Sequence, residues 1–359
     1  MNNVDNYSIK LKQYINYWIA RVKWTSIIKP YDPNYESHDC NLIFKEQISK
    51  RLPDDVSKFG KKSLKKNVKF QSGKVISFKT DASLVDVWVM YKKHAILSTM
   101  NVTATSGLEV SVIDTDGEIV NDVISPQSSQ QMLAHKIISA GRGLKVVFIT
   151  LPGYAEIHRI VIRTEKDSIF KKNDDYYGRS PIVFYGSSIT QGCAASRPIN
   201  NYVNIIAKHT GLPTVNYGFS ESANGEEEII RYIASTKAKA FVIEYDHNAT
   251  YDHLKETHNR VYQLIRSYQR KTPIIFISRM SIGLSANEAE CLNRKKVIET
   301  TVKNAQKNGD DKVGFVDGSM MFDRSAIRKY FADDRHPNDK GMMILAESVL
   351  EELKKLGAI

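Results

Sequence analysis

The chain has 359 residues, 42% of them hydrophobic and 25% charged, which is the composition of a protein with a sizeable buried core and, at this length, most often two domains. No window holds 18 uninterrupted apolar residues, so no membrane-spanning helix is expected, and three cysteines without a CxxC pair argue against a disulfide framework or a zinc ribbon. The formal net charge is +11; residues 1–80 carry 16 lysines and arginines against 7 aspartates and glutamates, whereas the remainder carries 35 against 33.

Residues 1–40 are predicted to form a helical extension. Apolar side chains recur there at helical spacing, before Pro30 and Pro33 end the pattern: Ile9, Tyr14, Ile15, Trp18, Ile19 and Val22. We expect this face to dock on the same protein or on a second copy rather than on a membrane. Polar residues interrupt the apolar stretch and no cleavage site follows, so no signal peptide is predicted and a cytoplasmic location is expected.

The basic N-terminal segment could attract an anionic partner, such as an acidic glycan, a lipid headgroup or nucleic acid. Its densest run, from Lys58 to Lys69, has few interleaved aromatic residues and matches no nucleic-acid-binding motif. We therefore expect no nucleic-acid partner and favour a solvated, lysine-rich segment. The pattern leaves the oligomeric state open.

Residues 41–165 are predicted to form an antiparallel β-sandwich of jelly-roll type. Short apolar or alternating segments are separated there by turn signals such as Asp116-Gly117 and Pro152-Gly153. The predicted strands are 75–80, 84–91, 108–113, 119–124, 145–151 and 157–163. The polar segment 166–180 is interpreted as a linker.

Residues 181–359 are predicted to form a three-layer α/β domain with a parallel, five-stranded, doubly wound sheet. Strands are expected at 182–186, 213–218, 240–246, 273–279 and 313–317. They alternate with helical patterns near 199–209, 225–236, 252–270, 287–308 and 339–355. Right-handed crossovers bring the carboxyl ends of all five strands to one edge.

Polar loops gather at this edge. The first is Gly186-Ser187-Ser188, and the others are residues 216–223, 244–249 and 333–338. A serine hydroxyl is a weak nucleophile and needs a histidine to accept its proton. An aspartate three residues before a histidine can hold the other ring nitrogen. The plainer interpretation of each loop alone is a polar turn after a strand, and Cys193 is interpreted as a small loop or core residue.

Together the four loops resemble the SGNH (GDSL-type) hydrolase superfamily, whose fold is flavodoxin-like. The resemblance covers residues 182–355 and implies that Ser188 is the nucleophile, His336 the base and Asp333 the residue that orients it. Ser187 stands where many members carry aspartate. The region before it resembles, more loosely, the sandwich domain of some carbohydrate-active members.

The oxyanion hole implied by the resemblance combines the N–H of Ser188, an N–H of the second loop and the amide of Asn248. One departure stands in the second loop, where Glu221 occupies the position that is usually glycine. A carboxylate beside an oxyanion is unfavourable unless it is turned away. Gly218 is the alternative donor if the loop is shifted.

Four further residues are candidates for substrate binding: Ser187, Arg197, Asp246 and His247. Arg197 could bind a carboxylate or a sugar hydroxyl, although an ordinary surface arginine is an equal interpretation. Asp246 and His247 could shape the acyl pocket, or one could support Asn248 while the other faces solvent. Asp334 is a second, less favoured partner for His336. No metal site and no cofactor are expected, because no ligand spacing and no phosphate-binding glycine loop is present.

The resemblance and the residues together predict a serine esterase that hydrolyses small O-acyl esters, O-acetyl groups on a saccharide in particular. Two alternatives stay open. An acyltransferase could use the same three residues on a cell-surface glycan precursor. A catalytically silent glycan-binding protein is favoured by Glu221 and opposed by intact Ser188, Asp333 and His336.

Overall fold

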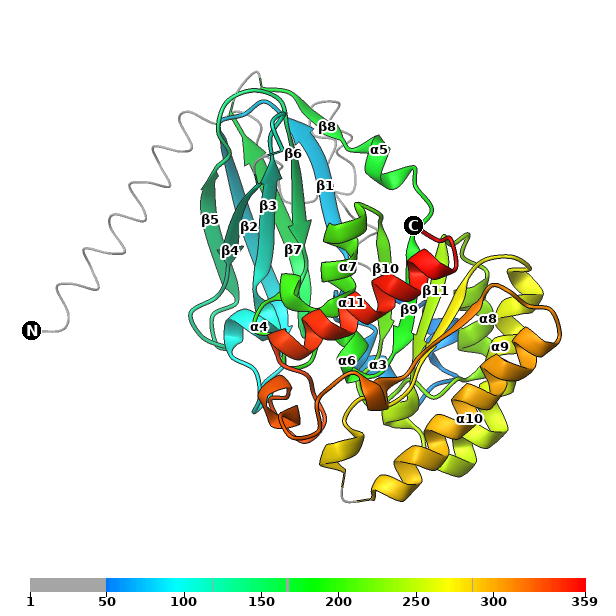
Figure 1. Ribbon diagram of the computed structural model, residues 1–359. Helices are drawn as coiled ribbons and strands as arrows, with labels where there is room; N and C mark the ends of the chain where they lie inside the picture. The colour runs from blue at the N-terminus through cyan, green and yellow to red at the C-terminus, as the bar shows by residue number, and fades with distance from the viewer. Residues whose placement is uncertain (1–49, 118, 166–167, 286) are drawn as a thin grey trace, which may run out of the picture.

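The computed structural model describes residues 50–117, 119–165, 168–285 and 287–359. The helical extension predicted over residues 1–40 therefore lies outside the described residues, as does Cys40. The described chain forms a β-sandwich that stands beside an α/β domain (Figure 1).

The α/β domain contains one parallel sheet in the order β10-β9-β11-β12-β13. Its strands are β9 (Ile182–Gly186), β10 (Thr214–Gly218), β11 (Ala240–Glu244), β12 (Ile274–Ile277) and β13 (Val313–Val316). Its α-helices are α6 (Ser188–Gln191), α7 (Tyr202–Thr210), α8 (Glu227–Ala234), α9 (Tyr251–Tyr268), α10 (Glu288–Lys307) and α11 (Asp339–Lys355). The predicted doubly wound α/β fold is confirmed.

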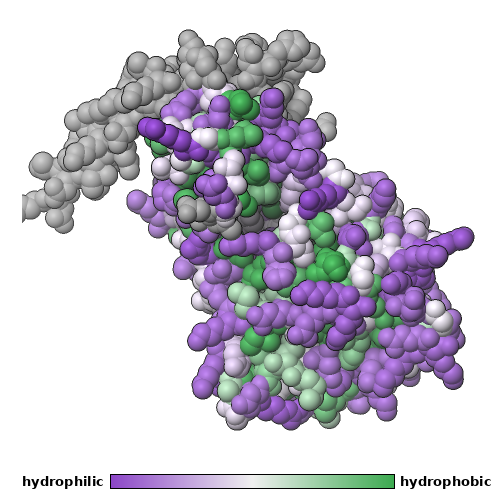
Figure 2. All heavy atoms as spheres, turned by 45° about the horizontal axis from the view of Figure 1, so that its top comes forward, coloured by the Kyte–Doolittle hydropathy of each residue, from purple (hydrophilic) through white to green (hydrophobic). Residues whose placement is uncertain are grey.

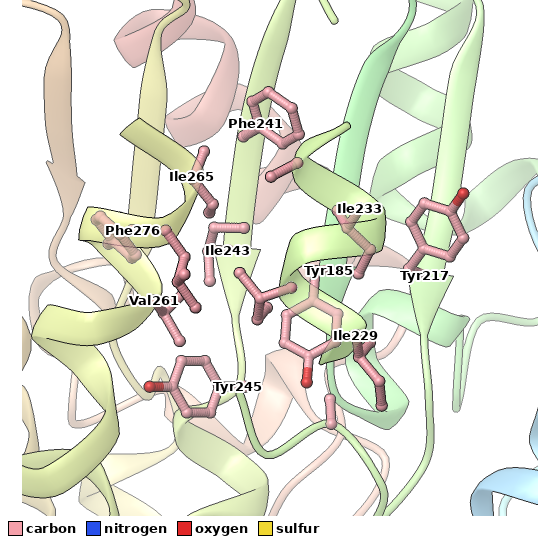
Figure 3. Packing of buried hydrophobic residues seen from close by; sticks show 14 of the residues in the cluster. Tyr185, Tyr217, Ile229, Ile233, Phe241, Ile243, Tyr245, Val261, Ile265 and Phe276 are labelled. Carbon is pink, nitrogen blue, oxygen red and sulfur yellow. The ribbon is translucent and has the colours of Figure 1, made fainter. Parts of the chain in front are cut away.

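Alternate residues of each strand enter different cores because side chains along a strand point to opposite faces. In β9, Val183 and Tyr185 belong to one buried cluster with residues of α8, α9 and α10, and Figure 3 shows Tyr185 next to Ile229 of α8. Ile182 and Phe184 pack on the other face with α7 and α11. Both faces of the sheet are therefore covered, which explains the continuous apolar runs in the sequence.

The strand order reverses next to β9, because β10 lies on one side of it and β11 on the other. In open α/β sheets, the loops that leave such a point diverge and create a crevice at the carboxyl edge. Ser188 follows β9 directly, so it is placed at this crevice.

The β-sandwich consists of two antiparallel sheets in the orders β4-β3-β6-β1-β8 and β5-β2-β7. The strands are β1 (Val75–Thr80), β2 (Leu84–His94), β3 (Leu108–Ile113), β4 (Ile119–Ile124), β5 (Leu133–Ser139), β6 (Lys145–Thr150), β7 (Ala155–Thr164) and β8 (Phe170–Lys172). The short helix α4 (Val102–Ser106) precedes β3. The predicted antiparallel sandwich is confirmed, and β5 is an additional strand that was not predicted.

The segment predicted as a linker has regular structure of its own. Its β8 pairs antiparallel with β1, and α5 (Asp174–Tyr177) follows. Phe170 packs on Phe78 with ring centroids 4.7 Å apart, which fixes the edge strand despite its lysines. The sandwich therefore extends beyond the boundary expected at residue 165.

Residues 51–70, expected in the sandwich, pack on the α/β domain instead. Their helices are α2 (Asp54–Ser57) and α3 (Leu64–Asn67), and Leu52, Leu64 and Val68 belong to the same buried cluster as α8. The lysines from Lys58 to Lys69 are all exposed, whereas Leu64 of α3 and the following Val68 are buried. This amphipathic pattern explains the dense basic run structurally.

The outer surface is largely polar. Figure 2 shows one face on which hydrophilic residues predominate and hydrophobic ones lie in small groups. Within the described parts of the chain, no helix combines the length and the apolar composition needed to cross a bilayer.

Candidate active site

Ser188 lies at the first position of α6, immediately after the turn that ends β9. Gly186 allows this turn, because a Cβ there would lie 2.2 Å from Thr190 Oγ1 and 2.5 Å from the Glu244 carbonyl oxygen. Ser187 caps α6 by accepting a hydrogen bond from the N–H of Ile189 at 3.1 Å. The Ser188 Oγ then lies 2.9 Å from His336 Nε2.

His336 is held from behind by Asp333. Its Nδ1 lies 2.7 Å from Asp333 Oδ2, while Oδ1 accepts the backbone N–H groups of Arg335 at 2.8 Å and His336 at 2.7 Å. Burial alone would raise the pKa of Asp333, but the hydrogen bonds from His336 outweigh it and lower the pKa below its usual value. An ionised Asp333 accepts from Nδ1–H, which leaves the Nε2 lone pair facing the serine hydroxyl.

The structure distinguishes between the two predicted donors in the second loop. The Gly218 N–H donates to Asn216 Oδ1 at 2.7 Å, so it is already used and Gly218 is not the oxyanion donor. The N–H groups of Phe219 and Ser220 are likewise bonded, to the Gly186 carbonyl oxygen and to Gln191 Oε1. Among the described residues, the Glu221 N–H has no acceptor, so it can donate a hydrogen bond to a bound group.

Two further N–H donors, besides that of Glu221, are available to an oxyanion. The Ser188 N–H also lacks an acceptor within the described part of the chain. Asn248 Nδ2 donates to the Phe219 carbonyl oxygen at 3.2 Å, which orients the amide and leaves its second hydrogen free. These N–H groups come from loops after β9, β10 and β11 and can stabilise a developing negative charge.

Glu221 has φ = 58°, in the left-handed region that favours glycine. Glycine would adopt this backbone conformation without strain. The Glu221 side chain is exposed, and no cation pairs with it among the described residues. Its charge is therefore screened by solvent.

We expect Glu221→Gly and Glu221→Gln to separate the effect of the strained backbone on stability from the effect of the carboxylate charge on activity. Glycine removes a conformational cost of about 1 kcal/mol, so Glu221→Gly should raise the thermal midpoint. Glu221→Gln removes only the charge and should raise kcat/KM about two- to fivefold through better stabilisation of the oxyanion. A lower kcat/KM in both variants, measured with folded protein, would show that the Glu221 carboxylate assists the reaction.

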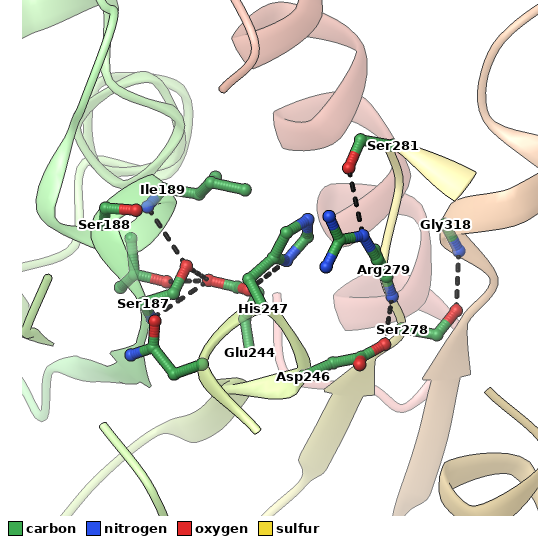
Figure 4. Close-up of polar contacts among 12 residues, drawn as sticks. Ser187, Ser188, Ile189, Glu244, Asp246, His247, Ser278, Arg279, Ser281 and Gly318 are labelled. Atoms are coloured by element: carbon green, nitrogen blue, oxygen red, sulfur yellow. Dashed lines mark hydrogen bonds and ion pairs between the residues drawn. The ribbon is translucent and has the colours of Figure 1, made fainter. Parts of the chain in front are cut away.

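A buried acid lies under the nucleophile turn. Glu244, at the end of β11, accepts hydrogen bonds through Oε2 from the hydroxyls of Ser187 at 2.8 Å and Thr190 at 3.0 Å (Figure 4). Its Oε1 lies 2.9 Å from His247 Nδ1. Burial raises the pKa of Glu244 to about 7, although the hydroxyl donors oppose the shift. Burial also lowers the pKa of His247 well below its usual value.

This network corrects two of the substrate-binding candidates. Ser187 is completely buried and bonded to Glu244, so its hydroxyl supports the turn and does not face the crevice. The His247 side chain is 1% exposed, and its Nε2 is sealed without a partner among the described residues. Neither residue presents a free group to a substrate.

The other two candidates are also engaged in contacts within the protein. Asp246 is buried, accepts the Arg279 backbone N–H at 2.6 Å and forms an ion pair with Arg294 at 3.4 Å. Arg197 pairs with Glu109 of β3 and thereby joins the two domains. Asp246 and Arg197 are therefore both held by ion pairs within the protein. No group of three or more His, Cys, Asp or Glu side chains in the described ranges is arranged to hold a metal.

The sandwich supports the second loop through residues that sequence patterns did not indicate. The Tyr154 hydroxyl lies 2.8 Å from Ser220 Oγ. Gln191 accepts the Ser220 N–H at 2.9 Å and donates to the Gly153 carbonyl oxygen at 3.0 Å. The turn before β7 thus holds the loop that presents the Glu221 N–H.

Two family models match the chain. Residues 179–354 match the GDSL-like lipase/acylhydrolase family, and residues 34–170 match the N-terminus of SGNH-hydrolase-type esterases. The chain belongs to the SGNH/GDSL hydrolase superfamily. The comparison with curated proteins found no match.

Several solved structures share the two-domain SGNH fold at low sequence identity. One, described as a GDSL-like lipase from Bacteroides ovatus, is 23% identical with a TM-score of 0.73, over 84% of this chain and 90% of that one. The salicylyl-acyltransferase SsfX3 from a tetracycline biosynthetic pathway is 20% identical with a TM-score of 0.71, over 86% and 90%. A family two carbohydrate esterase from Clostridium thermocellum in complex with cellohexaose is 16% identical with a TM-score of 0.53, over 80% and 94%.

Proposed function

We propose that this protein is a serine esterase that hydrolyses small O-acyl esters, with O-acetyl groups on a saccharide as the substrate class. The observation that carries the proposal is the alignment of Ser188 Oγ, His336 Nε2 and Asp333, together with Ser188 and Glu221 N–H groups that have no acceptor among the described residues.

In the first half-reaction Ser188 Oγ attacks the ester carbonyl carbon while His336 Nε2 accepts the hydroxyl proton. Asp333 stabilises the imidazolium that forms and keeps its ring in place. The N–H groups of Ser188 and Glu221 and the Asn248 amide bind the oxyanion. The C–O bond to the alcohol then breaks, and His336 returns the proton to the leaving oxygen, which leaves an acyl-enzyme on Ser188.

In the second half-reaction water attacks the acyl carbon as His336 accepts its proton. The oxyanion forms again at the same donors, the bond to Ser188 Oγ breaks, and the proton returns to the serine. The carboxylic acid is released and the enzyme is restored. Each proton has a defined donor and acceptor, so no metal or cofactor is required.

The preference for a saccharide rests on the likeness in fold to the family two carbohydrate esterases. Two other outcomes follow from the same site. An acyltransferase would pass the acyl group to an acceptor hydroxyl instead of water, and the salicylyl-acyltransferase SsfX3 has this fold. A binding protein would not turn over at all.

The test incubates the wild type and Ser188→Ala with acetylated oligosaccharides and with p-nitrophenyl acetate, with and without an unacetylated acceptor sugar. We expect acetate release that depends on Ser188 and stays dominant when the acceptor is present. Acetylated acceptor as the main product, identified by mass spectrometry, would replace the esterase with a transferase. No acetate and no transfer from folded wild type would contradict both.

A further inference from the structure

A nearly buried arginine without an acceptor for its terminal nitrogens lies after β12. Arg279 is 9% exposed, and its Nε donates to Ser281 Oγ at 3.2 Å. Neither Nη atom has a hydrogen-bond acceptor among the described residues. Neither is among the fully buried polar atoms without a partner, so both retain some exposure to solvent. Because the rest of the side chain is enclosed, these two nitrogens present unsatisfied donors to open space.

Arg279 follows β12 and therefore lies at the same carboxyl edge of the parallel sheet as the loop that carries the nucleophile. Figure 4 shows its guanidinium group beside the His247 ring, which bonds to Glu244 under the Ser187–Ser188 turn. Burial is the main cause of the low pKa of His247, and the charges of Arg279 and His336 lower that pKa further. His247 is thus within electrostatic reach of both groups.

Two other arginines lie near Arg279. Burial lowers the pKa of Arg279, Cys291 opposes this shift, and the neighbouring cations Arg294 and Arg335 lower the pKa further. Asp246 opposes this effect, but its carboxylate already accepts the Arg279 backbone N–H and forms an ion pair with Arg294. No carboxylate of the described chain lies within ion-pair distance of the Arg279 guanidinium.

A guanidinium held in a fixed orientation with two free terminal nitrogens suits a carboxylate, which can accept both donors at once. We propose that Arg279 binds a carboxylate carried by the ester substrate, so that the crevice selects acidic esters. This inference rests on the proposed esterase function. The carboxylate could belong to the acyl group, as in a half-ester of a dicarboxylic acid, or to the alcohol, as in an O-acetylated uronic acid.

Two matched substrate pairs distinguish these sources. Monoethyl succinate is compared with ethyl butyrate, and the methyl glycoside of O-acetylated glucuronic acid with that of O-acetylated glucose. We expect the wild type to prefer the acidic member of one pair, and Arg279→Met to lower this preference about 10- to 100-fold. Arg279→Lys should retain part of it. The readout is the ratio of kcat/KM for the acidic substrate to kcat/KM for the neutral one, so a loss of activity that affects both substrates equally leaves the ratio unchanged.

Arg324→Met is the matched control, because it removes the same charge from an exposed ion pair with Glu288. We expect it to keep the wild-type preference. A wild type that shows no preference in either pair, or a preference that survives in Arg279→Met, would overturn the carboxylate subsite while leaving the esterase intact. If Arg279→Met does not fold, Arg279→Gln replaces it in the same comparison.

Calorimetry separates failure of the subsite from failure of the esterase. Succinate and glucuronate are titrated into Ser188→Ala and into Ser188→Ala combined with Arg279→Met. Binding that weakens at least about tenfold on loss of Arg279 would support the subsite even if no ester is turned over. If no ester is turned over, binding that does not depend on Arg279 would overturn the subsite.

Discussion

Ser188→Ala is expected to lower kcat by about 10⁴-fold or more, because the variant has no nucleophile to form the acyl-enzyme. The only hydrogen bond of the Ser188 hydroxyl in the described structure is to His336, so its removal leaves no other group unsatisfied. Alanine is also favourable at the first turn of α6. The rate of p-nitrophenyl acetate hydrolysis and the thermal midpoint are measured together.

The adjacent serine provides the control. Ser187→Ala removes the cap of α6 and a donor to buried Glu244, so it should lower stability by about 1 kcal/mol or more. Its folded fraction should still hydrolyse the ester. Equal residual activity in both alanine variants would show that Ser188 is not the nucleophile.

Asp333→Asn should lower kcat about 10³- to 10⁴-fold with little change in structure. Asparagine can keep the two backbone N–H groups on its carbonyl oxygen, since Asp333 Oδ1 already accepts both. Its amide nitrogen would then donate to His336 Nδ1, which forces the proton onto Nε2. The imidazole would present a donor to Ser188, and proton removal would stop.

The pKa of Asp333 sets the expected pH dependence. Because the folded state lowers it, the carboxylate favours folding at pH values above its usual pKa, and this contribution is lost as pH falls through the lowered value. Asp333→Asn should remove this contribution to the loss of stability at acid pH, which is measured as the thermal midpoint at pH values between acid and neutral. Asp334→Asn serves as the control, because Asp334 is exposed and pairs with Arg328. A comparable loss of kcat in Asp334→Asn would move the orienting role to Asp334.

The arrangement of the α/β domain could be predicted because its strands are buried on both faces and its helices are amphipathic. Continuous apolar runs such as Ile182–Tyr185 alternate with helical periodicity, and this alternation permits few topologies. β5 was missed because the side of the strand that carries buried Ala134 and Ile138 also carries exposed Lys136, so its apolar residues do not alternate. The packing of Leu52 and Leu64 on α8 is a contact between distant segments, which local patterns do not encode.

Motif spacing could indicate the positions of Ser188, Asp333 and His336, and the structure brings them together. It could not decide between Gly218 and Glu221, because that choice depends on the bond from the Gly218 N–H to Asn216. The substrate-binding candidates were chosen as polar residues near the motif, yet their partners lie within the fold. Arg279 gave no signal, since a single arginine after a strand becomes informative only when its lack of an acceptor is known.

The measurement that tests the central claim most directly is labelling of the wild type with a serine-directed fluorophosphonate, followed by intact-mass and peptide mass spectrometry. The proposed mechanism predicts one adduct, located on Ser188, that is absent in Ser188→Ala and strongly slowed in Asp333→Asn. No adduct on folded wild type, or an adduct on a serine other than Ser188, would contradict it.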